Sequence, residues 1–273
     1  EKITNLNVNY SFLVKEKDFI RFLNIIGGIQ FFFDPSIFVS DDIYKRNSGD
    51  YKLYGKEIID FLRLPEKPEP MDYLNRLNRQ ESIILSIYDR IKELTEFRKE
   101  WITHFENKIT TELIGEELYS LFDFINKEKI VFSIKELPVE PFTPEKSERE
   151  FLLAKQDSGK ITFQKLKKFL EAEDYKYGEL VRSEILNSTD KNGLAKSVKS
   201  ILNEKRIKVL TVGNGWNSNE KFSVVIDRSG NSEFSYKIAN ILGIKKVRHI
   251  IDKELGLDTT VLLGEDFEIK PRK

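Results

Sequence analysis

The sequence has no cysteine, one methionine and two histidines in 273 residues, and no apolar run reaches the roughly 18 residues that a membrane-spanning helix needs. The absence of cysteine excludes disulfides, thiolate metal ligands and cysteine nucleophiles, but it does not fix the compartment. Charge of one sign is not in excess either, because Lys plus Arg and Asp plus Glu both total 45. Such a chain has no long-range field for a phosphate backbone, so we do not expect nucleic acid as a partner, although a local basic patch stays open.

Apolar residues make up 40% of the chain, and phenylalanine alone occurs 20 times. This is enough apolar area for a core, and the aromatic content of 12% argues against a disordered chain. The length favours two domains over one.

The start of the chain alternates between strand and helix patterns. Residues 7–14 resemble a strand, and Lys17–Ile26 has helical spacing. Gly27-Gly28 should end this helix, because glycine tolerates the left-handed backbone that closes one. Ile29–Phe33 then reads as a buried strand.

The next segment is polar and then helical. Residues 36–55 are expected to form a loop, followed by a short helix at Lys56–Leu64 and a proline-rich loop. A long helix should begin at Asp72, which fits an N-cap better than a metal ligand. We expect the buried face of that helix to carry Leu74, Leu77, Ile84, Ile87, Tyr88, Ile91 and Leu94.

From about residue 179 the pattern becomes regular. Strands are predicted at 180–186, 208–212, 222–227, 247–251 and 259–263, and helices at 193–204 and 233–242. The order β-α-β-β-α-β-β is typical of a sheet with helices on one face.

We therefore predict a mixed α/β (α+β) protein. Residues 1–144 should form a layered α-β-α domain, residues 145–178 a linker with one helix, residues 179–267 a small two-layer βαββαβ-type domain, and residues 268–273 a tail. The charged stretch Glu145–Glu150 fits a solvated linker.

Two segments resemble one family. LNIIGGIQFFF, LYGK with Ile58–Arg63, and RLNRQ at Arg76–Gln80 are similar to the second half of the LytR-CpsA-Psr domain. ILNSTDKNGLA, KVLTVGNG and DTTVLLGEDF, within Ser183–Phe267, are similar to the LytR C-terminal domain. The order of the matches carries the resemblance, since no single motif is decisive.

The departures from the family pattern concern its catalytic part. The central strands and the Asp/Arg cluster that hold a metal and a pyrophosphate in the family should precede this sequence. The second arginine of the family's helix motif is Pro65 here, and a family glycine is Ser188. The resemblance thus implies ancestry and an envelope location more than activity.

The family is thought to transfer glycopolymers from a polyprenyl-pyrophosphate carrier to peptidoglycan. By resemblance, Arg63, Arg76, Arg79 and Gln80 are candidates for binding an anion or pyrophosphate, because guanidinium groups bind phosphate through two parallel bonds. The alternative is that they are ordinary surface residues or pair with nearby glutamates. No confident catalytic residue and no metal ligand is assigned.

Other residues have a plainer interpretation next to the functional one. Trp216 lies in a Gly/Asn-rich turn and could stack on a sugar ring, although local packing is the commoner use of such a side chain. His104 and His249 have no metal-type partner at helical spacing and are interpreted as ordinary. Trp101 is expected in the core.

Three functions remain open. The first is a non-catalytic envelope protein that binds peptidoglycan or a related glycan and needs no cofactor. The second is a magnesium-dependent transferase acting on polyprenyl-linked glycopolymers. The third is an interaction scaffold with an exposed apolar surface. The resemblance implies an extracytoplasmic location, and the start at Glu1 rather than Met leads us to expect a removed signal or anchor segment.

Overall fold

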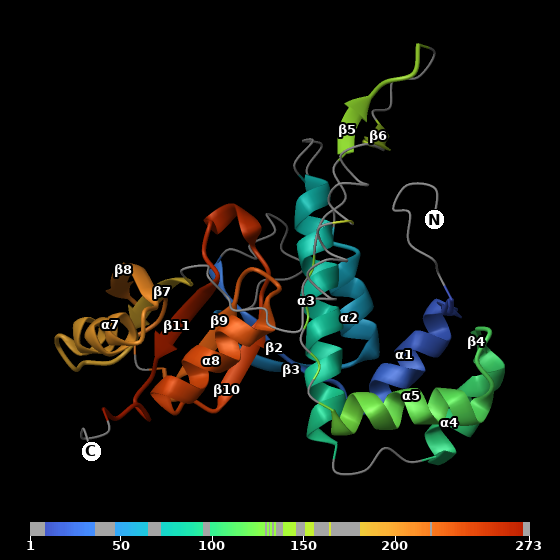
Figure 1. Cartoon of the computed structure of the whole chain (residues 1–273), viewed down its shortest axis with the longest axis horizontal. Helices are drawn as coiled ribbons and strands as arrows, with labels where there is room; N and C mark the ends of the chain where they lie inside the picture. The colour runs from blue at the N-terminus through green and yellow to red at the C-terminus, as the bar shows by residue number, and fades with distance from the viewer. Residues whose placement is uncertain are drawn as a thin grey trace.

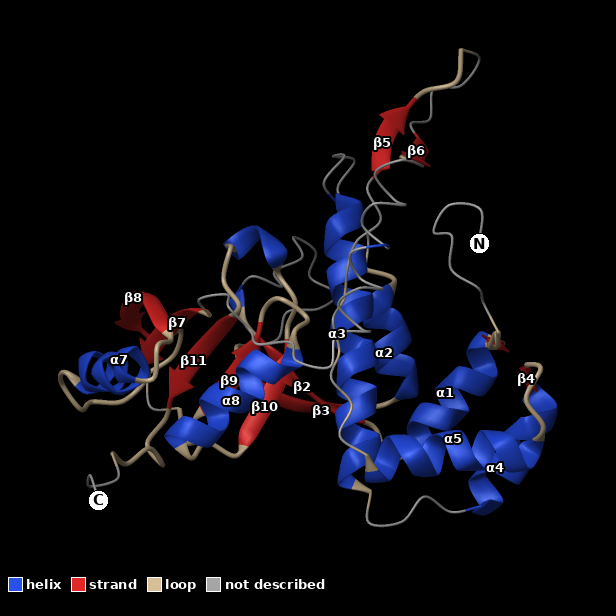
Figure 2. Ribbon diagram, viewed as in Figure 1, coloured by secondary structure: helices blue, strands red, loops and turns tan. Residues whose placement is uncertain are grey.

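The computed structural model describes residues 9–35, 47–64, 72–94, 99–128, 130, 132, 134, 139–145, 151–155, 164, 181–218 and 220–269. Helices and strands are mixed along these residues, which confirms the predicted α+β class (Figure 2). Within them, no helix is both long enough and apolar enough to cross a membrane.

The N-terminal part, residues 9–155, is mainly helical (Figure 1). Its helices are α1 (Glu16–Ile25), α2 (Gly55–Leu62), α3 (Asp72–Glu93), α4 (Lys99–Phe105) and α5 (Gly115–Lys127), with a 3-10 turn η3 (Glu106–Lys108). Its strands form antiparallel pairs: β1 (Leu13–Val14) with β4 (Ile109–Thr110), β2 (Ile29–Phe33) with β3 (Gly49–Leu53), and β5 (Val139–Phe142) with β6 (Phe151–Ala154).

The C-terminal part, residues 181–269, follows the predicted order of elements. It contains β7 (Arg182–Asn187), α7 (Leu194–Glu204), β8 (Lys208–Asn214), β9 (Val224–Asp227), α8 (Ser232–Leu242), β10 (Lys246–His249), η4 (Lys253–Leu255) and β11 (Thr259–Leu263). The five strands form one sheet in the order β10-β9-β11-β7-β8. β11 lies in the middle, parallel to β7 and antiparallel to β9.

Alternate residues of this sheet enter two different cores. Ile185, Val225 and Val261 pack with α7 and α8, and all three are fully buried. Their neighbours Leu186, Val224, Ile226 and Leu262 point to the opposite face and contact Phe32 and Trp216. Both faces of the sheet are therefore covered, which explains why its central strands are apolar throughout.

β2 is shared between the two parts of the molecule. Ile29, Phe31 and Phe33 pack into the N-terminal core, while Phe32 between them packs on the C-terminal sheet. The β2–β3 ribbon accordingly lies between α3 and that sheet (Figure 1). A strand with apolar side chains on both faces is what the run Ile29–Phe33 predicted.

Glycines determine how α1 and α2 meet this ribbon. Gly27 and Gly28 have φ of +82° and +75°, which confirms that they end α1. A Cβ on Gly28 would lie 2.5 Å from the carbonyl oxygen of Leu53, and one on Gly55 would lie 2.4 Å from the carbonyl oxygen of Ile20. Glycine is required at both positions because the backbones approach so closely.

Several predictions for the N-terminal part are wrong. Residues 36–55 are not loop throughout, because Gly49–Leu53 forms β3 against β2. Ile84 is 57% exposed instead of buried, whereas Ile83 and Leu85 on either side of it are in the interior. α3 contacts neighbours on most sides, so a single apolar stripe does not describe its buried surface.

Other predictions fall partly outside the described residues. The proline-rich loop lies there, as does the side chain of Asp72, the first residue of α3. Of the helix expected at Ile161–Ala172, only residue 164 is described, and it is helical. β6 lies within the segment predicted as linker and pairs with β5.

Candidate functional site

Two of the predicted anion-binding arginines lie at the end of α2. Arg63 directly follows that helix, and its 67% exposed side chain forms an ion pair with Glu16 at the start of α1. Arg79, in the second turn of α3, donates a hydrogen bond to the carbonyl oxygen of Leu64 at 3.3 Å. The chain thus brings Arg63 and Arg79 to the same helix end, with Arg63 directed toward α1.

The other two candidates lie on the exposed surface of α3. Arg76 and Gln80 are one turn apart and both exposed, and Ile84 continues the same row one turn further on. We call Arg76, Gln80 and Ile84 the α3 stripe. The structure therefore places the predicted residues in two adjoining groups: Arg63 with Arg79, and the α3 stripe.

The donor set for a metal is poor in the part of the chain that the structure describes. No group of three or more His, Cys, Asp or Glu side chains there could hold a metal ion. The described residues therefore offer no ligand set for the magnesium that a transferase would need.

Trp216 is half-buried against the N-terminal part. Its ring centroid lies 6.1 Å from that of Phe32, and the guanidinium carbon of Arg228 lies 5.8 Å from its ring. Its neighbour Asn217 donates a hydrogen bond to the carbonyl oxygen of Ser48 at 3.0 Å. Trp216 packs in this way between the two parts of the chain, and stacking on a sugar stays a prediction.

A set of polar contacts joins the N-terminal part to the C-terminal part, and we call these contacts the joint. Acidic side chains come from the N-terminal part and basic ones from the C-terminal part. The ion pairs are Asp34 with Arg228, Asp50 with Lys246 and Arg248, Glu81 with Lys253, and Asp89 with His249. The two surfaces therefore have opposite charge, which fixes how they fit together.

The joint contains one ion pair that is almost completely buried. Arg228 and Asp34 have side chains that are 1% and 0% exposed. The same guanidinium donates to the hydroxyl of Thr260 at 3.1 Å and to the carbonyl oxygen of Ile250 at 3.4 Å. A charge buried this deeply needs its partner, because removing either one leaves the other desolvated and unpaired.

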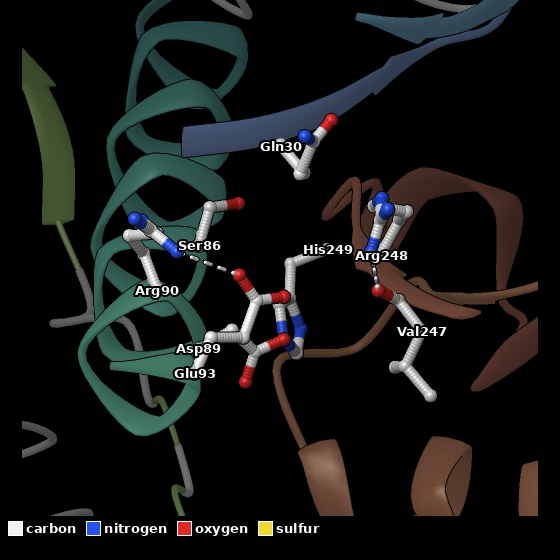
Figure 3. A pocket seen from close by; sticks show the side chains of 8 residues that line it. All are labelled: Gln30, Ser86, Asp89, Arg90, Glu93, Val247, Arg248 and His249. Carbon is white, nitrogen blue, oxygen red and sulfur yellow. Dashed lines mark hydrogen bonds and ion pairs between the residues drawn. The ribbon is translucent and has the colours of Figure 1, made fainter. Parts of the chain in front are cut away.

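His249 is another fully buried residue of the joint, and the sequence interpretation of it as ordinary is incomplete. Its Nδ1 lies 3.0 Å from a carboxylate oxygen of Asp227 in β9, and its Nε2 lies 3.0 Å from one of Asp89 in α3. Tyr236 of α8 donates its hydroxyl to the other oxygen of Asp89. Figure 3 shows His249 and Asp89 beside a cavity of about 10 Å³, room for about one water molecule.

The surroundings of the joint shift the pKa values of two residues in its ion pairs, His249 and Asp50. Burial alone would lower the pKa of His249, but the hydrogen bonds and charges of Asp227 and Asp89 outweigh it and raise the pKa to about 9. Burial acts on Asp50 in the opposite sense, and Arg248 and Lys246 reverse it, so that the pKa of Asp50 is lowered. Both shifts favour the charged forms that hold the joint together.

The sequence contains a weak signal for these residues. Asp227 ends the apolar strand β9 and Arg228 follows it, while His249 ends β10 directly before Ile250 and Ile251. Charged groups at the end of a buried strand need partners. The N-terminal partners, Asp34 for Arg228 and Asp89 for His249, are 194 and 160 residues away along the chain, so the pattern alone could not name them.

The N-terminal part also has an exposed apolar hollow of about 510 Å³. It is lined by Tyr10, Phe12, Leu113, Ile114, Glu116, Glu117, Ser120 and Leu121. Such a surface is of the kind that the scaffold hypothesis requires. Nothing in the described structure shows what covers it.

Comparison with models of protein families assigns the chain to a family. The model of the LytR_cpsA_psr family matches residues 1–168, and the chain belongs to this family. A second model, described as LytR cell envelope-related transcriptional attenuator, matches residues 181–267. Both matches confirm the resemblance of the two segments and support a role related to the cell envelope.

Several solved structures are similar to this chain, at low sequence identity. TagT bound to LIIa-WTA is 19% identical, with a TM-score of 0.48, and the match covers 62% of this chain and 64% of TagT. B. subtilis TagU is 21% identical, with a TM-score of 0.44 and coverage of 64% and 70%. A transcriptional regulator from Enterococcus faecalis is 18% identical, with a TM-score of 0.49 and coverage of 62% of each chain.

The chain thus spans less than two thirds of the TagT and Enterococcus faecalis structures. Among curated proteins, none matches this chain.

Proposed function

We propose that the chain is a cell-envelope protein that binds peptidoglycan or a related glycan, without catalysing its transfer. The observation that supports this most directly is the α3 stripe, on which Arg76 and Gln80 are exposed one turn apart. A guanidinium and an amide at this spacing can bind a carboxylate or phosphate and a neighbouring hydroxyl of the same polymer.

Nearby residues suit a long, partly apolar ligand. Ile84 extends the stripe with an exposed apolar side chain that can pack against the face of a sugar ring. Arg79 and Arg63 add positive charge at the end of α2, next to the start of α3. The same proposal places the protein in the cell envelope. Its partner is then a glycan and not a nucleic acid.

Retention on purified sacculi tests this proposal. We expect the protein to be retained above a control protein, and the double variant Arg76→Ala/Gln80→Ala to bind about tenfold more weakly or worse, because the lost charge-assisted bond of Arg76 alone is worth about 1.5–3 kcal/mol. Lys196→Ala, at an exposed position on α7, is the matched control and should bind like the wild type. Unchanged retention of the double variant, or no retention of the wild type, would contradict the proposal.

The alternative is the metal-dependent transferase, which the family membership favours. It requires binding of a polyprenyl pyrophosphate with magnesium, measured by calorimetry, and loss of that binding in Arg76→Ala. Magnesium-dependent binding of this lipid would favour the transferase over the binding protein, and its absence would leave glycan binding as the better account.

A further inference from the structure

We propose that a protonated His249 fastens the C-terminal part to α3, and that this contact sets the position of the helix that carries the α3 stripe. The fastening itself does not depend on any glycan. Only its effect on binding rests on the function proposed above.

The hydrogen-bond geometry around the ring suits an imidazole that carries two protons and faces two carboxylates. Both ring nitrogens of His249 lie 3.0 Å from carboxylate oxygens, one from Asp227 and one from Asp89. A neutral imidazole has a single N–H, so it could donate to only one of them and would face the other with a lone pair. A doubly protonated ring donates to both, and thereby connects β9 and β10 to α3.

The second oxygen of each of the two carboxylates also accepts hydrogen bonds. The second oxygen of Asp227 accepts from the backbone N–H groups of Ser229 and Gly230 at 3.2 and 3.0 Å. The second oxygen of Asp89 accepts the hydroxyl proton of Tyr236. Both carboxylates are therefore held in place, and His249 itself is 1% exposed.

Other charged groups near the ring have partners of their own. Arg90 of α3 donates to the carbonyl oxygen of Ile26 at 2.7 Å and to Glu93 at 3.3 Å. Arg248 of β10 forms two bonds with Asp50, at 2.7 and 2.9 Å. On α3 and α8, Tyr88 and Tyr236 complete the titratable groups around this site, and Gln30 from β2 is uncharged.

Two further contacts extend the fastening along α3. The hydroxyl of Ser82 accepts the backbone N–H of Ile251 at 2.9 Å, and Glu81 pairs with Lys253 at 2.9 Å. The contacts thus run over residues 81–89, directly after Gln80 in the stripe. An α-helix is rigid over such a length, about 14 Å from residue 80 to residue 89, so fixing one end orients the other.

The fastening should weaken in alkaline solution. The pKa of His249 in the folded protein is about 9, above the usual value of about 6.5. The stabilisation is therefore complete below about pH 6.5 and is lost as the pH rises through about 9.

Histidine NMR tests the protonation. The chain has two histidines, so two ring signals are expected, and His104→Gln identifies the one from His249. We expect that signal to titrate near pH 9. Asp89→Asn should move the midpoint down by at least one pH unit, because the amide is neutral and can donate to an unprotonated ring. Asp190→Asn, at an exposed position, is the matched control and should not move it.

Hydrogen exchange of the Ile251 amide tests the contact itself. Its protection factor should fall with the same midpoint as the His249 signal, since this amide donates to Ser82 across the joint. Titration of His249 at or below pH 6.5 would overturn the proposal. So would an Ile251 protection factor that does not change as His249 titrates. If Asp89→Asn does not fold, the wild-type titration and exchange still decide it.

Retention on sacculi at pH 7 and pH 9.5 separates this inference from the proposed function. If the wild type is not retained at pH 7, the glycan proposal fails while NMR still decides the fastening. If the joint loosens at pH 9.5 and retention relative to the Lys196→Ala control stays the same, His249 does not position the stripe.

Discussion

The two faces of the five-stranded sheet are covered in different ways. The face toward α7 and α8 is packed by apolar residues that all come from residues 181–267. The opposite face packs Phe32 and Trp216 beside the buried pair of Arg228 and Asp34, which combines residues far apart in the chain. The first face is built to hold the C-terminal part together, and the second to join it to the N-terminal part.

Asp34→Ala should have the largest effect and act on the second face. It leaves the guanidinium of Arg228 buried without its carboxylate, which costs about 3–5 kcal/mol. We expect this loss in the denaturant-induced transition followed by tryptophan fluorescence. The double variant Asp34→Leu/Arg228→Met should recover most of it, because no buried charge remains. A loss below about 1 kcal/mol in the single variant would show that the second face depends little on this pair.

Ile185→Ala and Leu186→Ala compare the two faces at adjacent positions. Each truncation of a buried side chain should cost about 2–4 kcal/mol. Ile185→Ala should destabilise the C-terminal part itself, whereas Leu186→Ala should first loosen the contact with Phe32. Hydrogen exchange can separate these effects, because α7 amides report on the first face and the Ile251 amide on the joint. Identical exchange patterns would show that the faces do not differ.

Arg63→Ala should have the smallest effect on stability. Its ion pair with Glu16 is at the surface, where solvent and side-chain entropy leave about 0–1 kcal/mol. Thermal unfolding should therefore shift little, and Ile251 exchange should not change. A loss above about 2 kcal/mol would mean that the end of α2 is a structural support and not an available anion-binding surface.

The C-terminal part could be predicted from its sequence because its signals are local. Each strand is a short apolar run, and each helix has its own apolar stripe between turn residues. Five strands and two helices were expected in the observed order, with boundaries that differ by only a few residues.

The wrong predictions in the N-terminal part have long-range causes. β3 has the sequence GDYKL, whose pattern is weak until Leu53 and Tyr51 pack beside β2. α3 is contacted by α2, α5, β2 and β10, which together bury most rows of its side chains. Ile84 lies on a row that these neighbours leave exposed.

In the candidate site, too, local features could be predicted from the sequence and long-range contacts could not. The spacing of Arg76 and Gln80 correctly indicates a shared helix face, because this depends only on helical periodicity. The partners of Arg63 and His249 depend on tertiary structure, since Glu16 and Asp89 are 47 and 160 residues away. Sequence periodicity carries no information about such pairs.

The sharing of β2 has a consequence for any attempt to study the C-terminal part in isolation. A fragment starting at Val181 would keep its helix-covered core, but it would lose the cover that Phe32 gives to Leu186, Val224, Ile226 and Leu262. An apolar strip of that kind, next to an uncompensated Arg228, promotes self-association. The isolated fragment is therefore expected to form soluble oligomers or precipitate, even though every one of its own helices and strands is intact.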